Sequence, residues 1–155
     1  MSSRTVPYNT KEVNWKTLLE KKLTIPMNQR NYSWDSNQII KFLDDIIEIF
    51  EEETYKEKMG SIISFIYKTD YDNGNDIYDG QQRILTTITL LNVIGCLSDK
   101  LKSRINTLLT IDTEIDELSS EQVKLKDEYQ VDKMPKIYCI NNFDMEALID
   151  MFNDR

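Results

Sequence analysis

Apolar and acidic residues recur at helical spacing between residues 36 and 54, which is the clearest pattern in the chain. The apolar positions lie one to four residues apart and form one stripe, while acidic residues fill the opposite face. Asp35 or Ser36 can cap the start of such a segment. The pattern predicts an amphipathic helix whose apolar stripe is Ile39, Leu43, Ile46, Ile47 and Phe50.

Turn residues divide the rest of the chain into further helix-like and strand-like segments. We expect helices at 14–21, 84–97 and 144–153, and two more within 98–133. We expect strands at 22–26, 59–67, 76–78 and 134–140, with a turn at 68–75. The β-branched and aromatic content of 59–67 predicts a central strand, and the apolar surface of 84–97 predicts a buried helix.

The strands at 59–67 and 76–78 form a predicted hairpin, and five residues, Asp79-Gly80-Gln81-Gln82-Arg83, join its second strand to the apolar helix at 84–97. A glycine at such a junction lets the backbone approach a ligand closely. The first amides of the helix lack intrahelical partners and lie at the positive end of its dipole. Gln81 and Gln82 add amide donors, and Arg83 adds a planar guanidinium suited to phosphate. The segment therefore predicts an anion site.

Asp79 has more than one interpretation. Its carboxylate could bind magnesium or position a water molecule, or it could cap the following helix. If it is a cap, Gly80 is only a turn residue. Capping does not explain the three long polar side chains that follow, so the neighbours of Asp79 favour a ligand site.

A second candidate segment contains Gln29, Arg30, Tyr32 and Trp34. Arg30 could reach a phosphate group or pair with Asp79. Either aromatic ring could stack on a base or fix the segment to the core, and for Trp34 we favour packing.

The acidic residues elsewhere have a simpler interpretation. Asp70 and Asp72 are interpreted as turn residues. Consecutive acids opposite an apolar stripe are typical of a solvated helix face rather than a metal site. This applies to Asp44, Asp45, Glu48, Glu51, Glu52 and Glu53.

Composition narrows the chemistry. The 155 residues contain no histidine, which excludes His-based acid-base catalysis, Ser-His and Cys-His nucleophiles, and His-containing zinc or nuclease sites. Carboxylates, guanidinium groups and amides remain, a set that suits nucleotide chemistry with magnesium. The net charge of −8 argues against unaided binding of a nucleic-acid backbone. Residues 1–40 nevertheless carry six cations against three anions.

Length and cysteine content indicate a single intracellular domain. A chain of 155 residues with 40% hydrophobic content can bury one core. The chain starts without the apolar block of a secretory signal, which indicates a cytosolic or nuclear protein. Cys96 and Cys139 lie among apolar residues and lack metal-ligand spacing, so we expect two buried free thiols.

Two motifs together resemble a known family. The first is Ile25-Pro26-x-x-Gln29-Arg30-x-Tyr32-x-Trp34. The second is the Asp79–Arg83 segment followed by Leu85-Thr86-Thr87, with a Gly60-Ser61-Ile62 strand start between the two motifs. In this order they resemble the N-terminal domain of the GmrSD-type restriction endonucleases, over about residues 15–152.

The resemblance implies an α+β fold with a ParB/sulfiredoxin-like core, in which a small mixed sheet packs against several helices and the C-terminal part is helical. It also implies that residues 1–155 form a single ParB-like nucleotide-binding domain, the N-terminal part of a longer cytoplasmic protein. The partner would be a nuclease domain or subunit. DNA contact by this chain would be weak or indirect, and no membrane contact is expected.

The same resemblance implies a pocket for a nucleoside triphosphate with Mg²⁺. Asp79, Gln82 and Arg83 would support hydrolysis, with Asp79 at the metal, while Tyr32 and Trp34 could stack on a base. The nucleotide-binding residues would be Gln29, Arg30, Gly80, Gln81, Gln82 and Arg83.

Two functions stay open at this point. In the first, a magnesium-dependent NTPase switches or powers DNA cleavage by a separate nuclease domain. In the second, the chain is a non-catalytic ParB-like protein- or DNA-interaction module. In that case the Asp79–Arg83 segment is structural, with Asp79 as a cap and Arg30 or Arg83 in an internal ion pair.

Overall fold

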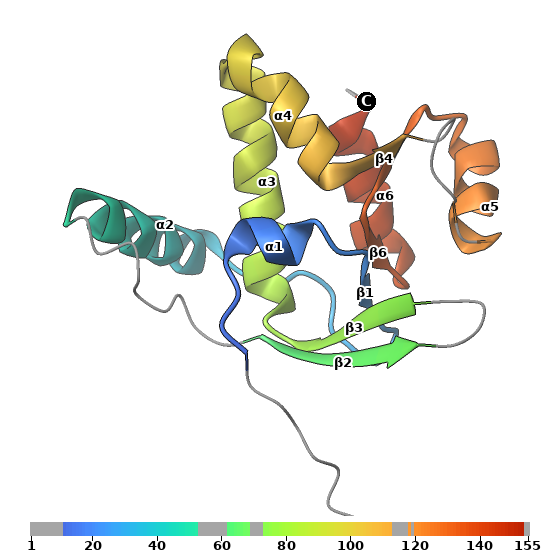
Figure 1. Cartoon of the computed structure of the whole chain (residues 1–155), viewed down its shortest axis with the longest axis horizontal. Coiled ribbons are helices and arrows are strands. Elements are labelled where there is room, and N and C mark those ends of the chain that lie inside the picture. Colours follow the sequence, from blue (N-terminus) through green and yellow to red (C-terminus); the bar gives the residue numbers. More distant parts are fainter. Residues whose placement is uncertain (1–10, 53–61, 69–72, 113–117, 119, 154–155) are drawn as a thin grey trace, which may run out of the picture.

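A small mixed sheet lies at one end of the fold (Figure 1). Strand β1 (Leu23–Ile25) lies between β3 (Asn73–Asp79) and β6 (Ile137–Cys139) and runs parallel to both. Strand β2 (Ile63–Lys68) pairs antiparallel with β3, which gives the order β2-β3-β1-β6. The computed structural model describes residues 11–52, 62–68, 73–112, 118 and 120–153.

Helices and a second, two-stranded sheet complete the described chain. Strands β4 (Thr110–Asp112) and β5 (Lys133–Pro135) pair antiparallel. The prediction of an α+β fold, with a small mixed sheet and a helical C-terminal part, is confirmed. The described helices are α1 (Trp15–Leu19), α2 (Ser36–Glu51), α3 (Gln81–Leu97), α4 (Asp99–Leu109), α5 (Ser120–Tyr129) and α6 (Asn142–Phe152).

The core joins the sheet to α1, α3, α4 and α6. Ile25, Ile77 and Ile84 are fully buried where β1, β3 and α3 meet. Burial of a side chain of this size stabilises the fold by about 1.5–3 kcal/mol. Helix α6 supplies a further buried group, Met145, Leu148, Ile149 and Phe152.

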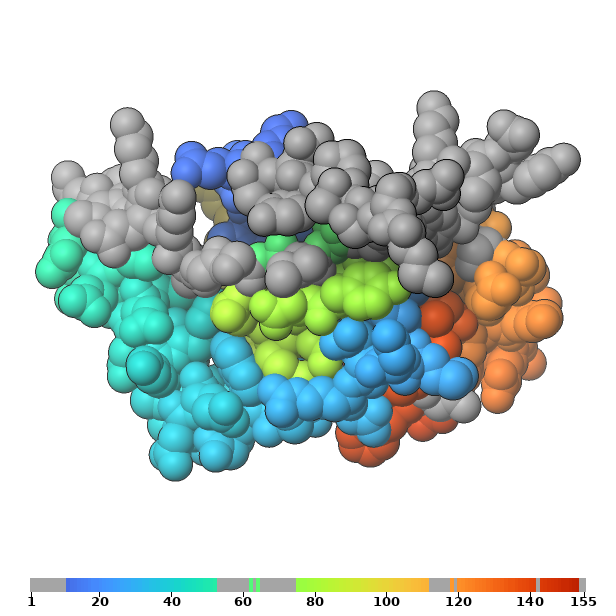
Figure 2. All heavy atoms as spheres, turned by 90° about the horizontal axis from the view of Figure 1, so that it is seen from below, coloured from blue at the N-terminus to red at the C-terminus, as the bar shows by residue number. Residues whose placement is uncertain are grey.

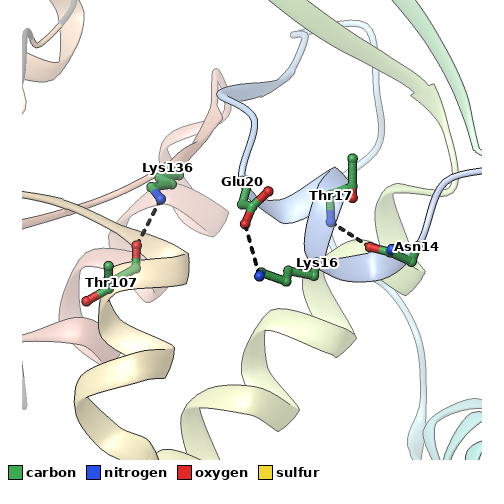
Figure 3. Close-up of polar contacts among 6 residues, drawn as sticks. All are labelled: Asn14, Lys16, Thr17, Glu20, Thr107 and Lys136. Carbon is green, nitrogen blue, oxygen red and sulfur yellow. Dashed lines mark hydrogen bonds and ion pairs between the residues drawn. The ribbon is translucent and has the colours of Figure 1, made fainter.

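Polar contacts fix the ends of several helices. Asp35 and Gln38 form a capping box at the start of α2: Asp35 accepts from the Gln38 N–H at 2.9 Å, and Gln38 accepts from the Asp35 N–H at 3.0 Å. Figure 3 shows Asn14 capping α1 through the Thr17 N–H at 2.8 Å. Because such caps satisfy amides that the helix itself cannot, they define where each helix begins.

The loop between β5 and β6 is tied to α4. Lys136 Nζ donates to the carbonyl oxygen of Thr107 at 2.9 Å, and the Lys136 N–H donates to that of Leu109 at 2.8 Å (Figure 3 shows the first). The predicted single strand at 134–140 is therefore wrong in one respect. It is two short strands in two different sheets, because the chain changes partner at Lys136.

Two other expectations are corrected. Strand β2 is not central but lies at the edge of the sheet, where only β3 pairs with it among the described strands. Apart from Gly95, the buried residues of helix α3 lie in its first half, and Val93 and Leu97 near its end are 48% and 82% exposed. The other helix predictions are confirmed, although the end of the 36–54 segment and the centre of the 68–75 turn lie outside the described residues.

Candidate functional site

The topology brings three loops to one edge of the sheet. Strands β1, β3 and β6 run parallel, so their carboxyl ends lie at the same edge. From there the chain continues into residues 26–34, into Gly80 and α3, and into residues 140–144 at the start of α6. Two candidate segments that are about fifty residues apart in the sequence therefore meet.

A cavity of about 240 Å³ lies where the first two of these loops meet. Figure 2 looks onto this face and shows atoms of the β3–α3 junction, in yellow-green, within a hollow bordered by the lighter blue segment that follows β1. The structure thus brings most of the predicted site residues together around one space. Its lining residues are Gln29, Arg30, Trp34, Asp79, Gly80, Gln81, Gln82 and Arg83.

Gly80 forms the start of α3. Its φ of +89° is a left-handed conformation that favours glycine, and an added Cβ would lie 2.7 Å from Ile62 Cγ1. Gly80 is the N-cap residue without a side-chain cap, and the Ile84 N–H donates to the Gly80 carbonyl as the first turn closes. Gln81 and Gln82 lie at the N-terminal end of α3 beside the cavity, where the helix supplies no acceptors for their amides, as an anion site requires.

Asp79 is the last residue of β3 and does not cap α3, so the capping interpretation is wrong. Its side chain is exposed at the cavity. Among the described residues no group of three or more acidic or cysteine side chains could hold a metal ion. A lone carboxylate still fits magnesium bound to a nucleotide, because Mg²⁺ commonly takes one or two carboxylates and completes its shell with phosphate oxygens and water.

The two glutamines at the start of α3 hold the 30–33 loop. Gln81 Nε2 donates to the Arg30 carbonyl at 2.8 Å. Gln82 Oε1 accepts from the Ser33 N–H at 2.8 Å, and its Nε2 donates to the Asn31 carbonyl at 3.3 Å. Both amide groups therefore position the loop that carries Arg30. Gln81 Oε1 is buried and has no partner among the described residues, so it is an acceptor beside the cavity.

Tyr32 and Asp144 anchor the same loop from the other side. The Tyr32 N–H donates to the Asp144 carboxylate, and its hydroxyl is 2.9 Å from Thr86 Oγ1. Thr86 Oγ1 donates in turn to the Gln82 carbonyl at 2.8 Å. Asp144 and Thr86 were not predicted as site residues from the sequence, although Thr86 belongs to the second motif. The available signal was Asn141 three residues before Asp144, an Asn-x-x-Asp pattern at the start of a predicted helix.

The two aromatic residues have different positions. Trp34 lines the cavity and also packs edge-on against Phe42 of α2, with ring centroids 5.4 Å apart. Tyr32 is half-buried against the core and is not among the residues that line the cavity. Base stacking stays a prediction for Trp34, and Tyr32 would need to leave its contacts to take part.

Two residues with cationic side chains, Arg30 and Arg83, line the cavity. Arg30 is exposed and makes no ion pair within the described chain, while Arg83 is half-buried. The two guanidinium groups come from different elements, Arg30 from the loop after β1 and Arg83 from the first turn of α3. Together with the α3 amides they give the cavity a positive character on an otherwise acidic chain.

Of the two cysteines, only Cys139 is buried as predicted, and Cys96 is exposed on the outer half of α3. Burial, with a smaller effect of Asp144, raises the pKa of the Cys139 thiol to about 12. A thiol with such a pKa is a poor nucleophile at neutral pH. Neither cysteine lines the cavity, so the structure offers no reactive thiol beside the candidate site.

The family follows from a match over most of the chain. The family model described as the GmrSD restriction endonuclease, N-terminal domain, matches residues 15–154. The chain belongs to this family. The GmrSD N-terminal domain matched here contains both motifs and all eight cavity residues, and membership links the chain to DNA restriction. No curated protein matches the chain. Within the described residues, no helix of this GmrSD domain combines the length and apolar character needed to cross a bilayer.

Proposed function

We propose that the cavity binds a nucleoside triphosphate with Mg²⁺ and supports its hydrolysis, and that this regulates DNA cleavage by a separate nuclease domain of the restriction system. The observation that carries the proposal is the meeting of Arg30, Arg83 and the start of α3 at one cavity. Guanidinium groups and free helix amides both bind phosphate oxygens.

Each cavity group has a role in this proposal. Arg30 and Arg83 bind phosphate oxygens, and the Asp79 carboxylate holds the metal, which supplies charge neutralisation for phosphoryl transfer when bound. Trp34 offers a face for the base. Gln82 already uses its amide on the 31–33 backbone, so its part in binding is to hold the loop. Gln81 does the same with Nε2 and keeps Oε1 as an acceptor for a water or hydroxyl group.

The test is a titration of ATP, GTP, CTP and UTP with Mg²⁺ against the wild-type chain and the variants Arg30→Ala and Arg83→Ala. Loss of one guanidinium–phosphate contact should weaken binding by about tenfold to a hundredfold. Arg104→Ala is the matched control, because Arg104 is exposed on α4 away from the cavity. Binding that is equal in all four proteins, or absent in the wild type, would refute the proposal. Phosphate release then tests hydrolysis.

One observation favours a second function, a non-catalytic interaction module. The side chains of both glutamines of the motif form hydrogen bonds with the backbone of the 30–33 loop, as expected if the motif only stabilises the fold. Thermal unfolding with and without nucleotide separates the two functions. A bound nucleotide raises the melting temperature of the wild type more than that of the Arg30→Ala variant, whereas a purely structural role gives no shift in either.

A further inference from the structure

Helix α2 carries an apolar surface that the rest of the described chain does not cover. In Figure 1 it extends to one side, away from the sheet and from the upper part of α3. Phe42, which packs on Trp34, is its one buried side chain. Ile40, Ile47 and Phe50 are 55%, 52% and 70% exposed. A helix of this length is marginal in water without an apolar contact, so the exposed surface calls for an explanation.

The three exposed residues and the half-buried Leu43 have the spacing of a helix-packing seam. Ile40, Leu43, Ile47 and Phe50 are separated by three, four and three residues, which is the a/d repeat of helices that pack side by side. We call these four residues the outer seam. The other apolar residues of α2 are half-buried or, for Phe42, buried, and they form its inner side, namely Ile39, Phe42, Ile46 and Ile49.

Acidic side chains border the outer seam on its solvent side. Asp44 and Glu51 follow Ile40 and Ile47 by four residues, which places each about 40° further around the helix. Both are exposed, as is Glu48 between them. A partner lying on the outer seam would meet this row of carboxylates directly.

We propose that the outer seam docks a helix from outside these 155 residues, with apolar residues at heptad spacing and Lys or Arg beside them. This inference does not depend on nucleotide binding. A second copy of α2 would bring Asp44 and Glu51 against their equivalents or against apolar side chains, both of which are unfavourable. Anionic lipid and nucleic acid would meet the same carboxylates. A helix with a basic border matches the seam and the charge together.

The experiment uses two synthetic three-heptad helical peptides with Ile at a and Leu at d, one with Lys and one with Glu at e and g. Their binding to the full chain is followed by fluorescence anisotropy. We expect the Lys peptide to bind about tenfold more tightly than the Glu peptide, with less difference at high salt. The double variant Ile40→Ser/Ile47→Ser should bind the Lys peptide about tenfold more weakly. The control, Val93→Ser on the exposed part of α3, should bind it like the wild type.

Reversing the charge of the acidic residues beside the outer seam gives a second test of the proposal. The double variant Asp44→Lys/Glu51→Lys should prefer the Glu peptide, and far-UV circular dichroism verifies that each variant is folded. Equal binding of both peptides by the wild type overturns the proposal. It is also overturned if the wild type sediments as a dimer that Ile40→Ser/Ile47→Ser converts to monomer, since the occupant is then a second copy. Binding of phosphatidylserine vesicles that the same variant loses overturns it as well.

Discussion

The backbone N–H of Tyr32 donates to the carboxylate of Asp144, 3.0 Å from Oδ2 and 3.2 Å from Oδ1, across 112 residues of sequence. Asp144 is 5% exposed and also accepts from the Asn141 side-chain amide at 3.0 Å. One buried carboxylate thus joins the start of α6 to the loop after β1. Because Arg30 lies two residues before Tyr32 in that loop, the contact fixes one wall of the candidate site.

Replacing this carboxylate should destabilise the whole domain. We expect Asp144→Ala to lower the free energy of unfolding by about 1–3 kcal/mol, because the Tyr32 N–H loses its acceptor in a partly buried place. Asp127→Ala, at an exposed position of α5, should change it by less than about 0.5 kcal/mol. Urea unfolding followed by circular dichroism measures both. Equal stability of the two variants would show that the loop does not depend on Asp144.

Variants of Gln82 and Arg30 should distinguish a residue that stabilises the fold from one that binds ligand. Gln82→Leu removes both hydrogen bonds to the 31–33 backbone, so we expect a loss of about 1–3 kcal/mol in the free energy of unfolding. Arg30→Ala removes an exposed side chain and should cost less than about 0.5 kcal/mol. Thermal unfolding without nucleotide tests this difference. If Arg30→Ala were the less stable protein, Arg30 would be a structural residue rather than a ligand group.

Gly80 and Gly95 should respond in opposite ways to alanine. At Gly80 the φ of +89° disfavours any side chain, and the new Cβ would collide with Ile62. We expect Gly80→Ala to destabilise the fold by about 1–3 kcal/mol. Gly95 is inside α3, and its nearest neighbour, Ile105 Cδ1, is at an ordinary 3.5 Å. Gly95→Ala should be neutral or stabilise by up to about 1 kcal/mol. Melting temperatures of both variants distinguish strain from helix propensity.

The sequence predicted local elements well because their signals are local. Periodicity and capping residues place α2 between Asp35 and Glu51, and turn residues place the β2–β3 hairpin. The position of a strand within a sheet depends on partners far along the chain. Nothing in residues 59–67 distinguishes an edge strand with one partner from a central strand with two.

The candidate site shows the same division. The chemistry of Asp79–Arg83 and Gln29–Arg30 is visible in the sequence, and the structure places both segments around one cavity. The sequence does not show which polar atoms already form hydrogen bonds within the fold. Gln82 appears there as a free amide, yet its partners are backbone groups about fifty residues earlier. Asp144 was assigned only to the start of a helix, because its contact with Tyr32 requires β1 and β6 to be parallel neighbours.

The buried Cys139 thiol should make stability fall in alkaline solution. Its pKa is raised from 9.0 to about 12 in the folded protein, chiefly by burial. Between these two values the unfolded chain releases the thiol proton while the folded chain keeps it, so unfolding becomes more favourable as pH rises. Urea unfolding at a series of alkaline pH values should therefore show a steeper decline for the wild type than for Cys139→Ala. The Tyr129 ionisation is common to both proteins, whereas the pKa of Tyr138 is raised by burial and in part by Cys139, so Tyr138 contributes to the same difference. Parallel pH profiles would contradict the prediction.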